Sequence, residues 1–256
     1  MPRVLKTIIP RIRRSLKERG VLVSACRSVL LPIHVLREWR GARTLKRGGH
    51  GSDFDRIHQV DTDGTYGGWT FLSDLDIPGA SWIDGNDYLP IEPERFARVL
   101  GSLAIPWNEY TFVDLGSGKG RALLLASQYP FKKITGVEFS PELHRIAEEN
   151  IRRYRPETQT CRKIESVNLD FRDFLLPESP LVLFFFDPCR GRVLADVVER
   201  IFESLATSPR PVYIAYVSPR AECEALFRSS PLITEICRNR ELDFVIYARV
   251  NSSLSA

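Results

Sequence analysis

Strand-like and helix-like segments alternate along the second half of the chain, from Tyr110 to Arg249. The predicted strands span residues 110–114, 133–139, 164–169, 181–186, 212–217, 233–237 and 244–249. The predicted helices between them span residues 118–129, 141–154, 193–205 and 221–227. This alternation is typical of an α/β domain with a parallel sheet, and the short turn before the last strand indicates an antiparallel hairpin. We therefore predict a mostly parallel seven-stranded sheet with an antiparallel C-terminal hairpin.

The N-terminal region, residues 1–50, is strongly basic. It holds 13 Lys/Arg against 2 Glu, a net charge of +11 in a chain whose total is +4. Apolar runs at 21–23 and 29–31 among the arginines predict an N-terminal helical extension. A basic arm can bind phosphates, so we expect RNA or an anionic membrane surface as partner of residues 1–47. The alternatives are arginine stems packed on the domain with solvated charges, or a transit peptide.

The predicted boundaries are 1–50 for the extension, 51–108 for a segment of loops and short helices, 109–250 for the main domain and 251–256 for a tail. The second segment, with a helix near residues 92–103, is expected to cover the ligand site of the main domain. Five cysteines, without CxxC spacing, argue against zinc and disulfides, and no metal site is predicted. A reducing, cytoplasmic location is expected, with peripheral membrane attachment through the arm.

The most specific motif is the glycine loop VDLGSGKGR, where the first predicted strand turns into the first helix. Glycines let the backbone approach a ligand, and a helix N-terminus offers free N–H groups. A P-loop requires GxxxxGK followed by Ser or Thr, but Gly120 follows Lys119 here. A dinucleotide loop requires GxGxxG, but Arg121 takes the place of the third glycine.

Charge favours one ligand class for this loop. Asp114 ends the first strand, two residues before Gly116. A carboxylate there repels the pyrophosphate of a nicotinamide cofactor and attracts the ammonium and sulfonium of S-adenosylmethionine (SAM). The alternative is that Asp114 only caps the following turn.

Three further acidic residues follow predicted strands. Glu138 is placed to accept the ribose hydroxyl protons, unless it is a solvated residue near a helix N-terminus. Asp170 is placed to accept the adenine amine, with Phe171 packing on the ring, unless both are loop and core residues. Asp187 follows an apolar strand and precedes a proline, which aims its carboxylate at a reaction centre. It is a candidate proton acceptor, and a helix cap is the alternative.

With these segments in order, residues 110–250 resemble the class I, seven-stranded SAM-dependent methyltransferases. The segments that carry the resemblance are VDLGSGKGR, GVEFS, NLDF and, more loosely, FFFDPC. The resemblance implies a Rossmann-like sheet and a glycine loop that holds the methionine part of SAM. It implies an acid for ribose after the second strand and an acid for adenine after the third. Carried to this chain, the cofactor-binding residues are Gly116, Ser117, Gly118, Gly120, Glu138, Phe139 and Asp170.

Upstream, residues 86–90 (NDYLP) are similar to the YxPT-like element that helps close the SAM site in seven-strand protein-lysine methyltransferases. Ile91 replaces the Thr of that element, and Tyr88 is a candidate cofactor contact and proton acceptor. FFFDPC resembles the [N/D]PP[Y/F] box of amino-methylating enzymes, from which Cys189 and Arg190 depart. We thus expect methyl transfer to an unidentified nucleophile, with a protein amine or a small molecule favoured. The alternatives are a non-catalytic SAM-binding module acting through its basic arm, a nucleic-acid methyltransferase and a nicotinamide dehydrogenase.

Overall fold

The computed structural model describes residues 52–64, 70, 75 and 85–249. Residues Gly51–Ala256 form one compact unit. The predicted basic extension and the tail at 251–256 lie outside the described residues. None of the described helices is both long enough and apolar enough to cross a membrane.

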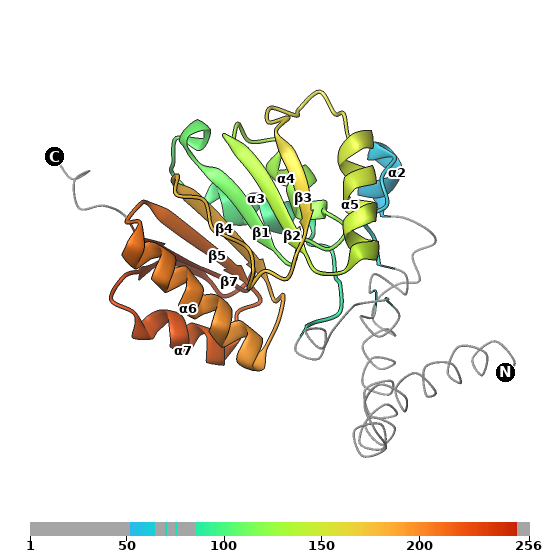
Figure 1. Cartoon of the computed structure of the whole chain (residues 1–256). Coiled ribbons are helices and arrows are strands. Elements are labelled where there is room, and N and C mark those ends of the chain that lie inside the picture. The colour runs from blue at the N-terminus through green and yellow to red at the C-terminus, as the bar shows by residue number, and fades with distance from the viewer. Residues whose placement is uncertain (1–51, 65–69, 71–74, 76–84, 250–256) are drawn as a thin grey trace, which may run out of the picture. The chain divides into compact units, whose positions relative to one another are not determined.

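A seven-stranded sheet forms the centre of this unit (Figure 1). Its strands are β1 (Thr111–Leu115), β2 (Lys133–Glu138), β3 (Ile164–Asn168), β4 (Leu181–Phe186), β5 (Val212–Val217), β6 (Thr234–Asn239) and β7 (Phe244–Arg249). The spatial order is β3-β2-β1-β4-β5-β7-β6. The first five strands pair in parallel, and β7 lies antiparallel to both β5 and β6. The prediction of a mostly parallel Rossmann-like sheet with an antiparallel C-terminal hairpin is confirmed.

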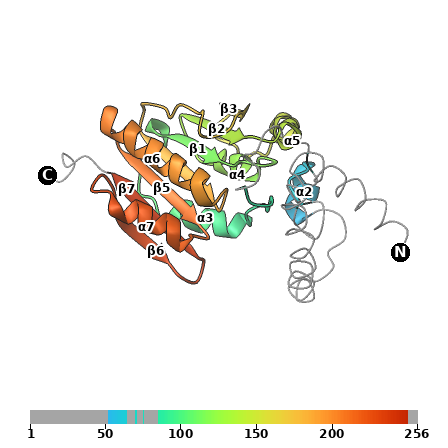
Figure 2. The same cartoon turned by 60° about the horizontal axis from the view of Figure 1, so that its bottom comes forward.

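Helices cover both faces of the sheet. They are α2 (Asp53–His58), α3 (Pro93–Gly101), the 3-10 turn η3 (Trp107–Glu109), α4 (Arg121–Ala126), α5 (Pro141–Arg153), α6 (Gly191–Thr207) and α7 (Ala221–Ser229). Figures 1 and 2 show α6 and α7 on one face, with α3 and α4 on the other. The first helix of the main domain begins at Arg121 and not at the predicted residue 118. Gly118 and Gly120 adopt φ of +54° and +87°, which keeps them out of a right-handed helix.

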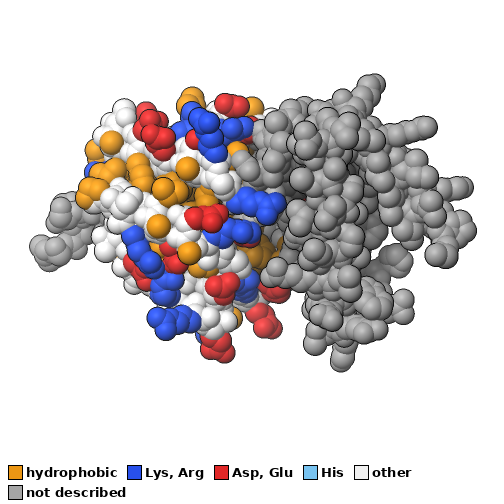
Figure 3. Space-filling view, turned by 90° about the horizontal axis from the view of Figure 1, so that it is seen from below, with side chains coloured by type: hydrophobic (Ala, Val, Ile, Leu, Met, Phe, Trp, Pro, Cys, Tyr) orange, Lys and Arg blue, Asp and Glu red, His pale blue; other side chains and the backbone are white. Residues whose placement is uncertain are grey.

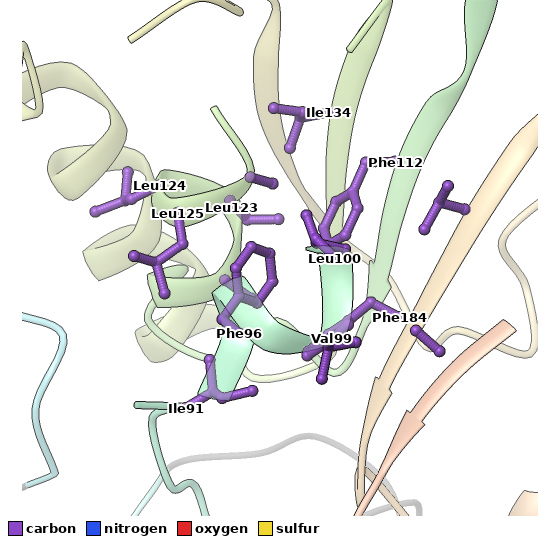
Figure 4. Packing of buried hydrophobic residues seen from close by; sticks show 14 of the residues in the cluster. Ile91, Phe96, Val99, Leu100, Phe112, Leu123, Leu124, Leu125, Ile134 and Phe184 are labelled. Carbon is purple, nitrogen blue, oxygen red and sulfur yellow. The ribbon is translucent and has the colours of Figure 1, made fainter. Parts of the chain in front are cut away.

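Each face has its own apolar cluster, because side chains alternate along a strand. Phe112 of β1 and Phe184 of β4 point to the α3 and α4 face, where Figure 4 shows them beside Phe96 and Leu100 of α3. The ring centroids of Phe96 and Phe184 are 5.3 Å apart. The helix α3, which precedes the main domain in sequence, is therefore part of the core.

Charged side chains are mixed on the surface of this unit. On the described part of the face shown in Figure 3, Lys and Arg side chains lie among Asp and Glu side chains. This mixture agrees with the sequence, in which the positive excess is concentrated in residues 1–50.

Candidate active site

A cleft lies at the carboxyl edge of the sheet, where β1, β2 and β4 end. It encloses about 580 Å³ of space not filled by atoms, part of it open to solvent. Its walls include strand ends, the glycine loop and residues 86–91. The predicted site residues among its lining are Asp114, Gly116, Ser117, Gly118, Glu138, Phe139, Asp187 and Tyr88. A carboxyl-edge cleft is the usual ligand position in an open α/β sheet.

Two glycines of the loop are required by its geometry. Gly116 has a φ of +88°, and a Cβ there would lie 2.7 Å from the Cβ of Pro188. Gly118 has a φ of +54°, and a Cβ there would lie 2.1 Å from Cε2 of Tyr88. The loop is thus shaped by close contacts from residues that follow β4 and from residues 86–91. Any larger side chain would push these walls of the cleft apart.

Two buried carboxyl groups lie side by side in the cleft. Asp114 of β1 and Glu138 of β2 are 4% and 2% exposed. Two causes raise the pKa of Asp114 to about 8: burial, which is the larger, and the proximity of Glu138. Burial also raises the pKa of Glu138 to about 7, although the N–H groups of Ser140 and Gly118 each donate to it at 2.8 Å. The site therefore favours a cationic ligand, which would relieve the repulsion between the carboxylates.

Glu138 keeps acceptor capacity for a ligand. Its two oxygens accept from the backbone N–H groups of Gly118, Ser140 and Phe139, and a carboxylate offers about four lone-pair sites. Ribose hydroxyl groups are donors of the kind it could still accept. Nearby, the buried Oγ of Ser117 has no hydrogen-bond partner among the described residues and packs against Gly136.

The two cations that follow the glycine loop are paired with acidic residues, and Arg121 also lines the cleft. Lys119 donates from Nζ to Asp61 Oδ1 and to the Asp63 carbonyl oxygen, both at 2.7 Å. Arg121, which is 5% exposed, forms ion pairs with Asp55 and Asp63. Neither cation is therefore available to neutralise a pyrophosphate. The sequence alone did not predict the pairs with Asp61 and Asp63, whose partners lie 58 residues apart in the chain.

Tyr88 packs on the glycine loop. Its hydroxyl donates to the Thr62 carbonyl oxygen at 2.6 Å, and its backbone exchanges two hydrogen bonds with Thr70, both at 2.9 Å. Burial raises the pKa of Tyr88 well above its usual value. The phenol is therefore protonated and already engaged as a donor. Tyr88 therefore lies in the cleft lining against the glycine loop, and its role as a proton acceptor stays a prediction.

Asp187 lies where β4 ends, with a φ of +44°. Its two carboxylate oxygens accept from Arg220, with Nη2 2.6 Å from Oδ2. The side-chain amide of Asn86 donates to its carbonyl oxygen at 2.6 Å. A non-glycine residue with positive φ at a cleft indicates a constrained position. Arg220 was missed from the sequence, although it follows β5, the strand that pairs with β4.

The remaining predicted residues are outside the cleft lining. Asp170 forms an ion pair with Arg172 in the loop after β3, with 2.7 Å between Oδ2 and Nη2. Phe171 is 8% exposed and belongs to the apolar cluster on the α6 and α7 face. Gly120 precedes α4 as its N-cap. Within the described residues, no group of three or more His, Cys, Asp or Glu side chains could hold a metal ion.

Neither a protein-family model nor a curated protein sequence matches the chain. Solved structures with a similar fold include the 23S rRNA methyltransferase ErmE (TM-score 0.46, 14% identity, 64% of this chain and 70% of that chain). Another is a ribosomal protein L11 methylase from Lactobacillus delbrueckii subsp. bulgaricus (0.43, 15%, 60% and 74%). A third is an RNA methyltransferase from Salinibacter ruber in complex with S-adenosyl-L-homocysteine (0.41, 17%, 66% and 100%). The fold that the chain itself shows is a seven-stranded, mostly parallel Rossmann-like sheet.

Proposed function

We propose that the chain is a SAM-dependent methyltransferase. The observation that carries the proposal is the pair of buried carboxyl groups, Asp114 and Glu138, in a cleft whose neighbouring cations are already paired. Asp114 attracts the positive charges of SAM, and Glu138 accepts from the ribose hydroxyls. The residues proposed to hold the methionine part and the ribose edge are Gly116, Ser117, Gly118, Gly120 and Phe139.

The adenine end of the cofactor is assigned to the loop after β3. We propose Asp170 as acceptor for the adenine amine and Phe171 as its apolar neighbour. Asp170 follows β3, which pairs with β2, the strand that Glu138 ends. The Asp170 carboxylate accepts from the backbone N–H, Nε and Nη2 of Arg172, which fixes its orientation in the loop after β3.

SAM supplies an electrophilic methyl group with a good leaving group. The residues of the chain have to align the acceptor and exclude water from the cleft. Tyr88 and Phe139 contribute apolar surface to its wall. Asp187 is proposed to hold the acceptor group and to take up its proton at a carboxylate oxygen, while Arg220 fixes the orientation of that carboxylate.

Asp187→Asn should lower methyl transfer by about 100-fold and leave the affinity for SAM within about twofold. The amide keeps the shape of the side chain but cannot accept a proton. Single-turnover transfer to an acceptor-containing fraction, with calorimetry of cofactor binding, measures the two effects separately. Glu199→Gln, the same loss of charge at an exposed acid of α6, is the matched control and should transfer at the wild-type rate. Full transfer by Asp187→Ala would remove Asp187 from the mechanism.

The test of the proposed activity combines binding and transfer. Calorimetry with SAM and S-adenosylhomocysteine measures cofactor binding, and tritiated SAM with fractionated lysate detects transfer. A protein amine or a small molecule is the acceptor we favour. Label in nucleic acid would establish the alternative of a nucleic-acid methyltransferase. Tight binding without transfer to any fraction would favour a non-catalytic SAM-binding module.

We further propose that residues 1–47 bind an anionic partner, RNA or an anionic membrane surface. The support is their charge, since 1–50 carries +11. Binding to anionic vesicles or to RNA should weaken at least tenfold between 50 and 200 mM salt, as expected for several phosphate contacts. It should disappear on deletion of 1–47. Equal binding by the truncated chain would contradict this proposal.

A further inference from the structure

Arg121 is buried, although arginine side chains are mostly exposed in folded proteins. It is 5% exposed and lies at the first turn of α4, directly after the glycine loop. Its Nη2 donates to Ser52 Oγ at 2.9 Å and lies 3.2 Å from Asp55 Oδ1. Its guanidinium also lies over the ring of Phe54, 4.8 Å from the centroid. One side chain thus gathers residues 52–63, which we call the latch segment, onto the glycine-loop helix.

Thr62 connects this arrangement to the cleft. Its side-chain hydroxyl accepts from Arg121 Nε and donates to Asp55 Oδ1. Its backbone N–H donates to Asp55 Oδ2 at 2.7 Å, so both its hydroxyl and its N–H are fixed. Its carbonyl oxygen is the acceptor of the Tyr88 hydroxyl at 2.6 Å. Thr62 therefore links the two residues in one chain of contacts: its hydroxyl is bonded to Arg121 and its carbonyl oxygen to Tyr88.

The other end of this chain is the cofactor cleft. The Tyr88 ring lies so close to Gly118 that no Cβ could be placed there. Residues 85–91, the cleft segment, are also tied to the end of β4, because Asn86 donates to the Asp187 carbonyl oxygen at 2.6 Å. The position of Tyr88 thus sets one wall of the cleft, and within the described part of the chain the Thr62 carbonyl oxygen accepts its hydroxyl.

We propose that Arg121 is a positioning residue for the cofactor cleft. It fixes the latch segment so that Thr62 holds Tyr88 on Gly118, and this inference rests on the proposed function for its effect on SAM. The guanidinium fork suits this role better than an ammonium, because it bonds several acceptors in one plane. The pairing of Arg121 with Asp55 is buried on both sides, so loss of one partner leaves an uncompensated charge.

Arg121→Lys should therefore weaken S-adenosylhomocysteine binding by about tenfold, the loss typical of a charge-assisted hydrogen bond. Tyr88→Phe, which removes only the hydroxyl at the far end of the chain, should cause a loss of similar size. The double variant should bind S-adenosylhomocysteine with the same affinity as whichever single variant binds it less tightly. The reason is that both changes break the same connection. Arg145→Lys, on an exposed arginine of α5, is the matched control and should bind like the wild type.

Hydrogen exchange gives a readout that needs no cofactor. Arg121→Lys should raise exchange in residues 52–63 and also in the cleft segment, while β1 and β4 keep wild-type protection. If that variant does not fold, Asp63→Asn is the second variant. It weakens the ion pair between Arg121 and the latch segment at a side chain that is 25% exposed. The inference would be overturned if the loss of affinity in the double variant equalled the product of the two single losses. It would also be overturned if exchange became faster in residues 52–63 without any change in residues 85–91. Absence of cofactor binding in the wild type would instead refute the proposed function, and the exchange result would still decide the role of Arg121.

Discussion

Asp114→Asn should abolish detectable SAM binding and at the same time raise the thermal stability of the protein at alkaline pH. Asp114 is buried beside Glu138 with a pKa of about 8, far above its value in an unfolded chain. The folded state therefore keeps a proton that the unfolded state has released, and the free energy of unfolding falls as pH rises from about 4 to 8. The amide lacks this titration. Its Tm at pH 8.5 should exceed the wild-type value by at least about 3 °C.

The same variant tests the charge argument for the cofactor. In the wild type, affinity for SAM should rise between pH 6 and 7.5, because the ligand cation favours the ionised carboxylates over the protonated ones. Glu203→Gln is the matched control, since Glu203 is an exposed acid of α6 outside the cleft lining and the latch segment. It should bind SAM with the wild-type pH dependence. Wild-type affinity in Asp114→Asn would show that the Asp114 charge does not select the ligand.

Gly118→Ala should lower the free energy of unfolding by about 3 kcal/mol and eliminate cofactor binding. The backbone at Gly118 is left-handed, which costs an L-residue about 1–2 kcal/mol. The added methyl group would lie 2.1 Å from the Tyr88 ring, so the ring must leave its place, and such overpacking costs about 1–3 kcal/mol. Urea unfolding measures the first effect, and calorimetry with S-adenosylhomocysteine measures the second.

Gly101→Ala is the matched control for this substitution. Gly101 is the last residue of α3, and a Cβ there would meet nothing within 4 Å. The free energy of unfolding should rise by about 0.5–1 kcal/mol, the usual gain when alanine replaces a helical glycine. When Gly118→Ala is made in a protein that already carries Tyr88→Ala, it should lower the free energy of unfolding only by the backbone cost. A loss no larger than the backbone cost of about 1–2 kcal/mol in Gly118→Ala would mean that Tyr88 does not lie on the loop.

The sheet was predictable from the sequence because hydrophobic pattern and strand length leave few alternatives. The β4 segment, Leu181–Phe186, is apolar throughout and is buried on both faces, as its composition predicts. The positions of Asp114 and Glu138 followed directly, since residues at the ends of adjacent parallel strands meet at one edge of the sheet. The start of α4 was predicted too early because the glycine pattern does not reveal the φ values of Gly118 and Gly120.

The connections made by long side chains could not be predicted. Lys119 and Arg121 reach acids more than 50 residues earlier in the chain, and no local pattern specifies such partners. The same limit applies to Asp187, whose pair with Arg220 depends on how the loops after β4 and β5 turn. Asp170 was predicted from its place after β3, but the choice between a ligand and Arg172 is made by loop geometry. The sequence therefore indicated the ends of β1, β2 and β4 and residues 86–90 as cleft lining, but not the ion pairs around them.

The central claim is that a buried pair of carboxyl groups makes this cleft a site for a sulfonium cofactor and not for a pyrophosphate one. The most direct test is calorimetric titration of the purified chain with SAM, S-adenosylhomocysteine and NAD at pH 7.5. We predict binding of SAM and S-adenosylhomocysteine, with loss of SAM binding in Asp114→Asn and no binding of NAD. Binding of NAD, together with no heat from either adenosyl compound, would contradict the account.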